Sequence, residues 1–243
     1  MRDFLTVVWK EFHELFLQRG TRRGTIYSMA IFLSLFGILM PLSLGREWVE
    51  TPASMFYWGF LPFMMVNNVI ADSFAGERER HTLETLLASR LPDLPILLGK
   101  VATAILYGFG TSMLGMLISL ITVNISAGHG TLLLYPLYIA FGLPVVSFLV
   151  AALAAGIGVL VSLHAATVRQ AQQTVGMAFF VVFLPLLLFP LLPTEWKAGV
   201  VQFLQTADLG AISIGALVLL FLVDLVLLAI SAAQFRRNRL ILD

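Results

Sequence analysis

The fold is decided by the longest stretch without a charged side chain, which runs from Val101 to Val168 and reads VATAILYGFGTSMLGMLISLITVNISAGHGTLLLYPLYIAFGLPVVSFLVAALAAGIGVLVSLHAATV. A transmembrane helix needs about 20 apolar residues to cross the roughly 30 Å hydrocarbon core of a bilayer, so this stretch is too long for one span. A cluster of turn-forming residues, Asn124-Ile-Ser-Ala-Gly-His-Gly-Thr131, divides it. The stretch therefore predicts two transmembrane helices, over residues 101–123 and 137–162.

Shorter uncharged stretches elsewhere predict four more spans, over residues 26–45, 53–72, 174–192 and 209–233. Barrel strands would alternate in polarity over about 10 residues, whereas these runs are continuously apolar. The predicted fold class is therefore all-α: a polytopic membrane protein with six transmembrane helices in a single domain over residues 1–243.

Composition supports a membrane protein and excludes several other classes. Hydrophobic residues make up 59% of the chain and charged residues 12%, with a mean hydropathy of +0.92. Soluble domains are about 45–50% apolar and about 25% charged, so both a soluble enzyme and a disordered chain are excluded. A net charge of +1 leaves no basic field for nucleic acid. Without cysteine, the chain has no disulfide and no thiolate metal site.

The basic residues give the expected orientation. With six spans, 13 of the 15 Lys and Arg residues fall on the side that holds both termini, and only Arg46 and Lys197 fall on the other. Because cytoplasmic loops carry the excess of Lys and Arg, both termini are expected to be cytoplasmic. The expected location is the plasma (cytoplasmic) membrane of a prokaryote.

An amphipathic segment precedes the first span. At 100° per residue, one face is apolar and the opposite face is polar. The apolar face holds Phe4, Leu5, Val8, Trp9, Phe12, Leu15 and Phe16, and the polar face holds Asp3, Lys10, Glu11, Glu14 and Gln18. The pattern predicts, within residues 1–23, a helix that lies in the cytoplasmic membrane interface. An ordinary juxtamembrane helix that only anchors the chain is the alternative.

The first cytoplasmic loop, residues 77–95, begins with a dense run of charges, Glu77-Arg-Glu-Arg-His81, and continues as Thr82-Leu-Glu-Thr-Leu-Leu-Ala-Ser-Arg-Leu91 before Pro92. Its leucines share one face of a short predicted helix. An apolar ridge with a charged entry fits docking into a groove on another protein. The alternative is a solvated loop whose leucines fold back onto the membrane.

This loop, followed by Gly99-Lys100, resembles the first cytoplasmic loop of the ABC transporter type 2 exporter permeases, although His81 stands where that family often has glycine. Residues 162–173 and the basic ending 235–240 resemble the same family. The resemblance extends over the whole chain and implies a permease subunit that moves a substrate by alternating access.

The resemblance also implies the partners: a second permease chain, in a homo- or heterodimer, and two copies of a separate ABC ATPase. This chain has no Gly-x-x-x-x-Gly-Lys-[Ser/Thr] motif, since Leu94 stands where the first glycine would be. ATP and magnesium are therefore expected on the partner ATPase, with no cofactor bound by this chain. The implied coupling residues are Glu77, Arg78, Glu79, Thr82, Leu83, Glu84, Leu86, Leu87 and Leu91.

By the same resemblance, the translocation path is lined by the second and fifth spans. Its candidate residues are Asn67, Asn68, Phe179, Phe180 and Phe183. Polar groups at membrane depth cost free energy unless they are paired, which favours the asparagines. Hydrogen bonding between helices is the alternative for the asparagines, and packing is the alternative for the phenylalanines.

Asp224, inside the sixth predicted span, is a possible intramembrane polar site for a proton or cation. Its alternatives are a position near one end of a tilted span, or bonding to Ser213 or Ser231. An intramembrane enzyme is disfavoured because Leu17 replaces the second histidine of a His-Glu-x-x-His motif that begins at His13. A haem-related exporter subunit of cytochrome c maturation, and a non-transporting membrane scaffold or channel, remain as alternative functions.

Overall fold

The computed structural model describes residues 2–17, 19–51, 53–82, 91–128, 130–188, 193 and 209–235. All regular secondary structure in this part of the chain is helical. The elements are α1 (Arg2–Leu17), α2 (Arg19–Ser34), the π-helical turn η1 (Leu35–Leu39), α3 (Met40–Leu44), α4 (Glu47–Glu50), α5 (Ala53–Glu79), α7 (Asp93–Ala127), α8 (Leu137–His164), α9 (Val168–Leu188) and α11 (Leu209–Gln234).

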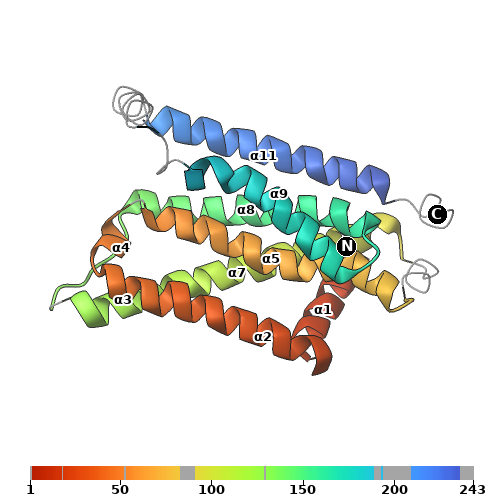
Figure 1. The fold of residues 1–243 in the computed structure, drawn as a ribbon, viewed down its shortest axis with the longest axis horizontal. Coiled ribbons are helices and arrows are strands. Elements are labelled where there is room, and N and C mark those ends of the chain that lie inside the picture. The colour runs from red at the N-terminus through yellow and green to blue at the C-terminus, as the bar shows by residue number, and fades with distance from the viewer. Residues whose placement is uncertain are drawn as a thin grey trace.

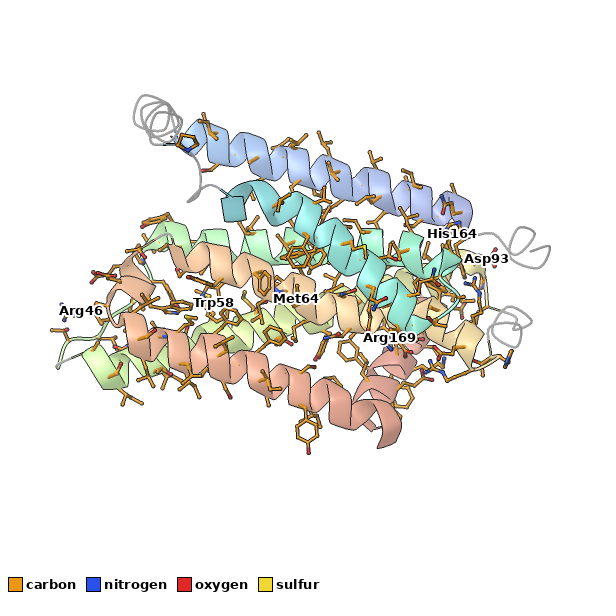
Figure 2. All side chains as sticks on the ribbon, in the orientation of Figure 1. Arg46, Trp58, Met64, Asp93, His164 and Arg169 are labelled. Atoms are coloured by element: carbon orange, nitrogen blue, oxygen red, sulfur yellow. The ribbon has the colours of Figure 1, made fainter. Side chains whose placement is uncertain are left out.

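The long helices lie side by side, and α1 runs across one end of the bundle (Figure 1). The central helix is α5, which packs against α7, α8 and α9, whereas α11 packs chiefly against α8 on the outside. Arg46 marks one end of the bundle, and Asp93, His164 and Arg169 mark the other, where α1 lies (Figure 2). These labelled residues distinguish the two ends of the bundle.

Among the described residues, four helices are long and apolar enough to span a membrane: Ile26–Leu44, Asp93–Ala127, Leu137–His164 and Gly210–Gln234. They coincide with four of the predicted spans. Helices α5 and α9 occupy the positions predicted for the second and fifth spans, and these two remain predictions as spans. Helix α5 is less apolar, since it contains Asn67 and Asn68.

Several helices extend beyond the predicted spans. Helix α5 continues to Glu79 although its span was predicted to end at residue 72, and α7 begins at Asp93 although its span was predicted to begin at residue 101. Hydropathy marks the edge of a hydrocarbon layer and not the end of a helix, so a helix can continue past the limit of its predicted span. The continuous helices carry the charged side chains out of the apolar layer on rigid supports.

Small residues let α5 approach its neighbours closely. A Cβ atom added at Gly158 of α8 would lie 2.1 Å from Cγ2 of Ile70, and one added at Gly108 of α7 would lie 2.5 Å from Cγ2 of Val66. Ser162 strengthens the α5–α8 contact, since its hydroxyl donates to the carbonyl of Ala71 and accepts from the amide of Ala75. Close packing between membrane helices relies on such small residues, which makes α5 and α8 a firmly joined pair.

We predict that Gly158→Ala destabilises the protein by about 1–3 kcal/mol, because the new methyl group forces α5 and α8 apart. Gly110→Ala in α7 is the matched control, since nothing lies within 4 Å of its Cβ position. Alanine favours a helix over glycine by about 1 kcal/mol, so the control should be neutral or stabilising. Thermal unfolding of both purified variants in detergent tests this, and equal melting temperatures would contradict it.

Candidate functional site

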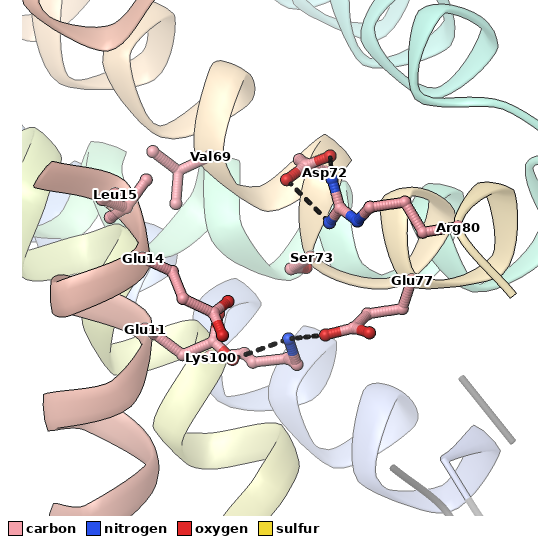
Figure 3. A pocket seen from close by; sticks show the side chains of 9 residues that line it. All are labelled: Glu11, Glu14, Leu15, Val69, Asp72, Ser73, Glu77, Arg80 and Lys100. Carbon is pink, nitrogen blue, oxygen red and sulfur yellow. Dashed lines mark hydrogen bonds and ion pairs between the residues drawn. The ribbon is translucent and has the colours of Figure 1, made fainter. Parts of the chain in front are cut away.

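A buried ammonium group lies where α1, α5 and α7 meet. The side chain of Lys100 is 2% exposed, and its Nζ lies 2.8 Å from Oε1 of Glu11 and 3.5 Å from Oε1 of Glu77 (Figure 3). The same Nζ lies 5.6 Å from the centre of the Phe74 ring. A charge removed from water must be paired, and here two helices each supply a carboxylate to one cation of a third.

Lys10, a second and more exposed cation, extends this network of charged side chains toward the surface. Nζ of Lys10 lies 3.2 Å from Glu14, 3.7 Å from Glu11 and 3.9 Å from Glu77. Arg80 donates to both carboxylate oxygens of Asp72 at 3.2 Å. The network surrounds a cavity of about 30 Å³, which is room for about two water molecules (Figure 3).

Burial and neighbouring charge act against each other at Glu77. Burial alone raises the pKa of this carboxyl, but Lys100, the hydroxyl of Thr82 and Lys10 together hold its pKa below the ordinary value. The carboxylate therefore stabilises the fold above its ordinary pKa, and that contribution is lost as the pH falls through the lowered one. At neutral pH Glu77 is ionised.

Carboxylates of Glu11, Glu14 and Glu77 place oxygens within 4.8 Å of one another, as in a metal site. The ammonium groups of Lys10 and Lys100 already contact these same oxygens. The donor set therefore forms a salt-bridge network that is balanced by lysine.

The end of α5 is closed by a two-bond capping motif. The amide of Thr82 donates to the carbonyl of Glu77 at 2.8 Å, and the amide of His81 donates to the carbonyl of Arg78 at 3.0 Å. This motif requires a left-handed residue at position 81, and His81 has φ 56°. Glycine adopts that conformation most readily, which explains why glycine suits this position. The hydroxyl of Thr82 also bonds to the carboxylate of Glu77.

Arg78 and Glu79, which follow Glu77 in the last turn of α5, face the turn between α8 and α9. Arg78 donates to the carbonyls of Leu163 and Ala165, and Oε2 of Glu79 accepts from the amide of Val168 at 3.1 Å. Each of the three charged residues that end α5 thus contacts a different part of the bundle.

Among the implied coupling residues, Leu83, Glu84, Leu86 and Leu87 lie outside the described residues. The others flank that segment: Glu77 is buried, Arg78 is half-buried, Glu79 and Thr82 are exposed, and Leu91 packs against the core. Sequence reasoning missed Lys100 and the acids of α1 as members of this site. The available signal was the polar face of α1 together with a lysine next to a long apolar run.

The candidate path residues lie in different surroundings. Asn68 is exposed, whereas Asn67 is half-buried, its amide lies 3.5 Å from the carbonyl of Gln172, and its Oδ1 has no partner among the described residues. Phe179 is 3% exposed and its ring centre lies 4.4 Å from that of Phe63, so it packs between α5 and α9. Phe180 is exposed. Phe183 belongs to α9, and its side chain lies outside the described part of the structure.

Asp224 points into the contact of α11 with the bundle. It is 4% exposed, and neither carboxylate oxygen has a hydrogen-bond partner among the described residues. The expected alternative of bonding to Ser231 is not seen, since the hydroxyl of Ser231 donates to the carbonyl of Leu227 at 2.8 Å.

Comparison with known families places this geometry in context. The family model described as ABC-2 type transporter matches residues 2–189, from α1 through the last described residue of α9. The chain belongs to the ABC-2 type transporter family. It is a permease subunit of an ABC transporter, an integral membrane protein that associates with an ABC ATPase, and no nucleotide-binding domain family matches it. No curated protein matches the chain.

In this ABC-2 family permease, we predict that Lys100→Met lowers the free energy of unfolding by about 3–5 kcal/mol, because Glu11 and Glu77 lose their nearer, buried cation and keep only the more distant Lys10. The triple variant Lys100→Met, Glu11→Gln, Glu77→Gln should recover most of that loss. Melting temperatures in detergent measure both effects. A Lys100→Met variant as stable as the parent would show that the network contributes little.

Proposed function

We propose that this chain is the membrane half of an ATP-driven exporter in which two permease chains stand above two ABC ATPase subunits. The observation that carries the proposal is that both flanks of residues 83–90 are tied to one buried network. Glu77 lies before this segment and Lys100 lies after it, and the two side chains are paired. A loop held in this way transmits force from a partner to several helices at once.

The coupling loop docks in a groove of the ATPase. Four leucines form the apolar ridge that the sequence predicts for this loop and that enters the groove: Leu83, Leu86, Leu87 and Leu91. ATP and magnesium bind to the partner, and closure of the two ATPase subunits moves the loop. Because both flanks are tied to α1, α5 and α7, this movement changes the access of the path from one side of the membrane to the other.

The translocation path lies along α5 and α9. Exposed Asn68 would be costly against lipid, and the unpaired Oδ1 of Asn67 would also be costly in a dry interface. A water-filled path between two permease chains satisfies both groups. Exposed Phe180 lies on the same helix as Phe183, and Phe179 reaches the path when α5 and α9 separate.

The end of the bundle with α1 faces the cytoplasm of a prokaryote, in keeping with the distribution of Lys and Arg. Leu5 and Trp9 of α1 are 57% and 68% exposed. An exposed leucine and tryptophan one turn apart suit the interface between headgroups and hydrocarbon, so α1 lies there. Its acidic face turns the other way, toward Lys100.

We predict that the tagged chain, solubilised in mild detergent, carries with it a soluble ATPase with a P-loop in about equal amount, as mass spectrometry will show. Leu87→Asp should abolish this association, because a carboxylate cannot enter an apolar groove without its water. Leu132→Asp is the matched control, since Leu132 is 76% exposed and follows Thr131, which bonds to Arg46 at the opposite end of the bundle. An ATPase that stays bound to Leu87→Asp would contradict the docking assignment, and absence of any ATPase would favour a scaffold or channel.

Asp224 serves as a proton or cation site in the transport cycle. We predict that Asp224→Asn changes the pH dependence of ATP hydrolysis by the purified complex in lipid nanodiscs, because an amide cannot take up and release a proton as a carboxyl group does. Ser231→Ala, a buried residue about two turns further along α11, should leave the profile unchanged. A profile identical to that of the parent would assign Asp224 a purely structural role.

A further inference from the structure

Three consecutive charged residues end α5, and each contacts a different part of the bundle. Successive residues of a helix point about 100° apart, so Glu77, Arg78 and Glu79 face three directions. Glu77 faces α1 and α7 through the lysines, Arg78 faces the last carbonyls of α8, and Glu79 faces the first amide of α9. The last turn of α5 is therefore a junction between the coupling loop and the rest of the permease.

The contact with α8 is firm. Arg78 donates to the carbonyl of Leu163 at 2.7 Å and to the carbonyl of Ala165, which are otherwise unsatisfied groups at a helix end. Ser162, the residue before Leu163 on α8, bonds through its hydroxyl to the backbone of the preceding turns of α5, at Ala71, Phe74 and Ala75. Helices α5 and α8 are thereby joined by hydrogen bonds as well as by close packing.

The contact with α9 depends on fewer groups. The hydroxyl oxygen of Thr167 accepts from the amide of Gln170 at 3.2 Å, and the side chain of Gln170 accepts from the amide of Ala166 at 3.0 Å. These bonds cap α9 from within its own turn. The amide of Val168 is instead satisfied by Glu79, whose negative charge also suits the positive end of the α9 dipole.

Small side chains place the turn directly on α5. Ala71 and Ala75 of α5 form a buried cluster with Ala165 and Ala171, which stand on either side of the α8–α9 turn. Alanine allows backbones to approach closely, so a displacement of the end of α5 reaches the turn without passing through flexible side chains. The Asn67 amide and the Gln172 carbonyl add a further α5–α9 contact.

We infer that Arg78 and Glu79 are positioning residues that carry movement of the coupling loop to the α8–α9 turn and so to α9. This inference rests on the proposed coupling function. Residues 83–90 begin four residues after Glu79, directly after the cap in which Thr82 bonds to Glu77 in the last turn of α5. Rotation of that turn moves the guanidinium of Arg78 and the carboxylate of Glu79, and α9 follows through its first amide.

The absence of cysteine from the chain permits a direct test with a single thiol-linked fluorophore. One reporter is placed at Leu94→Cys, exposed in the first turn of α7 beside the loop, and another, in a separate protein, at Gln173→Cys, exposed on α9. Each is purified with its ATPase, and the fluorescence change on adding ATP with magnesium is recorded. Both reporters should respond in the parent.

In the Arg78→Ala, Glu79→Ala variant, the Leu94 reporter should keep its response and the Gln173 reporter should lose it, with the ATPase still bound. Glu79→Gln keeps an oxygen that can accept from Val168 and should retain the response on α9. The control is His164→Ala, which removes an exposed side chain at the same end of the bundle, outside the charge network, and should leave both responses intact.

An undiminished Gln173 response in the alanine variant would overturn the inference. If that variant loses its ATPase, the single variant Glu79→Ala, which keeps both bonds of Arg78, gives the same comparison. Failure of the proposed function looks different, because neither reporter would then respond to nucleotide even in the parent protein.

Discussion

The pairing of Lys100 with Glu11 and Glu77 is the interaction on which the arrangement of this end of the molecule depends. An ammonium group that is 2% exposed is tolerable only where carboxylates replace its water, and here they come from α1 and α5. The requirement fixes where three helices meet. It also holds α1 across the end of the bundle, with its acidic face inward and Trp9 outward. The lowered pKa of Glu77 keeps the network charged at neutral pH.

Much of the fold could be predicted from the sequence because the bilayer leaves few choices. Backbone groups in hydrocarbon must bond within their own segment, so a long uncharged run such as 137–162 has to be a helix. Four of the predicted spans coincide with described helices of sufficient length and hydropathy. The helix ends at Glu79 and Asp93 lie beyond the predicted spans because polar residues end an apolar layer without ending a helix. Periodicity showed that Glu11 and Lys10 share a face of α1, but no periodicity reveals which neighbour that face meets.

The candidate site was only partly predictable for a similar reason. Glu77, Arg78 and Glu79 were singled out by resemblance, yet their partners are backbone groups and a lysine far along the chain, which no local pattern contains. His81 shows the opposite case. Its departure from glycine was visible in the sequence, and φ 56° supplies the reason that a residue without a Cβ suits this cap. Phe179 was proposed for the path, but its surroundings, the rings of Phe60 and Phe63, come from another helix.

The peripheral place of α11 has a consequence for how the protein is made. This helix packs chiefly against α8, and only 6% of its most apolar window is buried. It follows the other described helices along the chain, so a bundle of those helices can assemble before α11 is synthesised. A carboxyl at the centre of an entering helix costs about 2.5–3.5 kcal/mol, which the surrounding leucines and valines offset during insertion. Burial of Asp224 then follows the packing of the earlier helices, because it takes place when α11 docks on a surface that already exists.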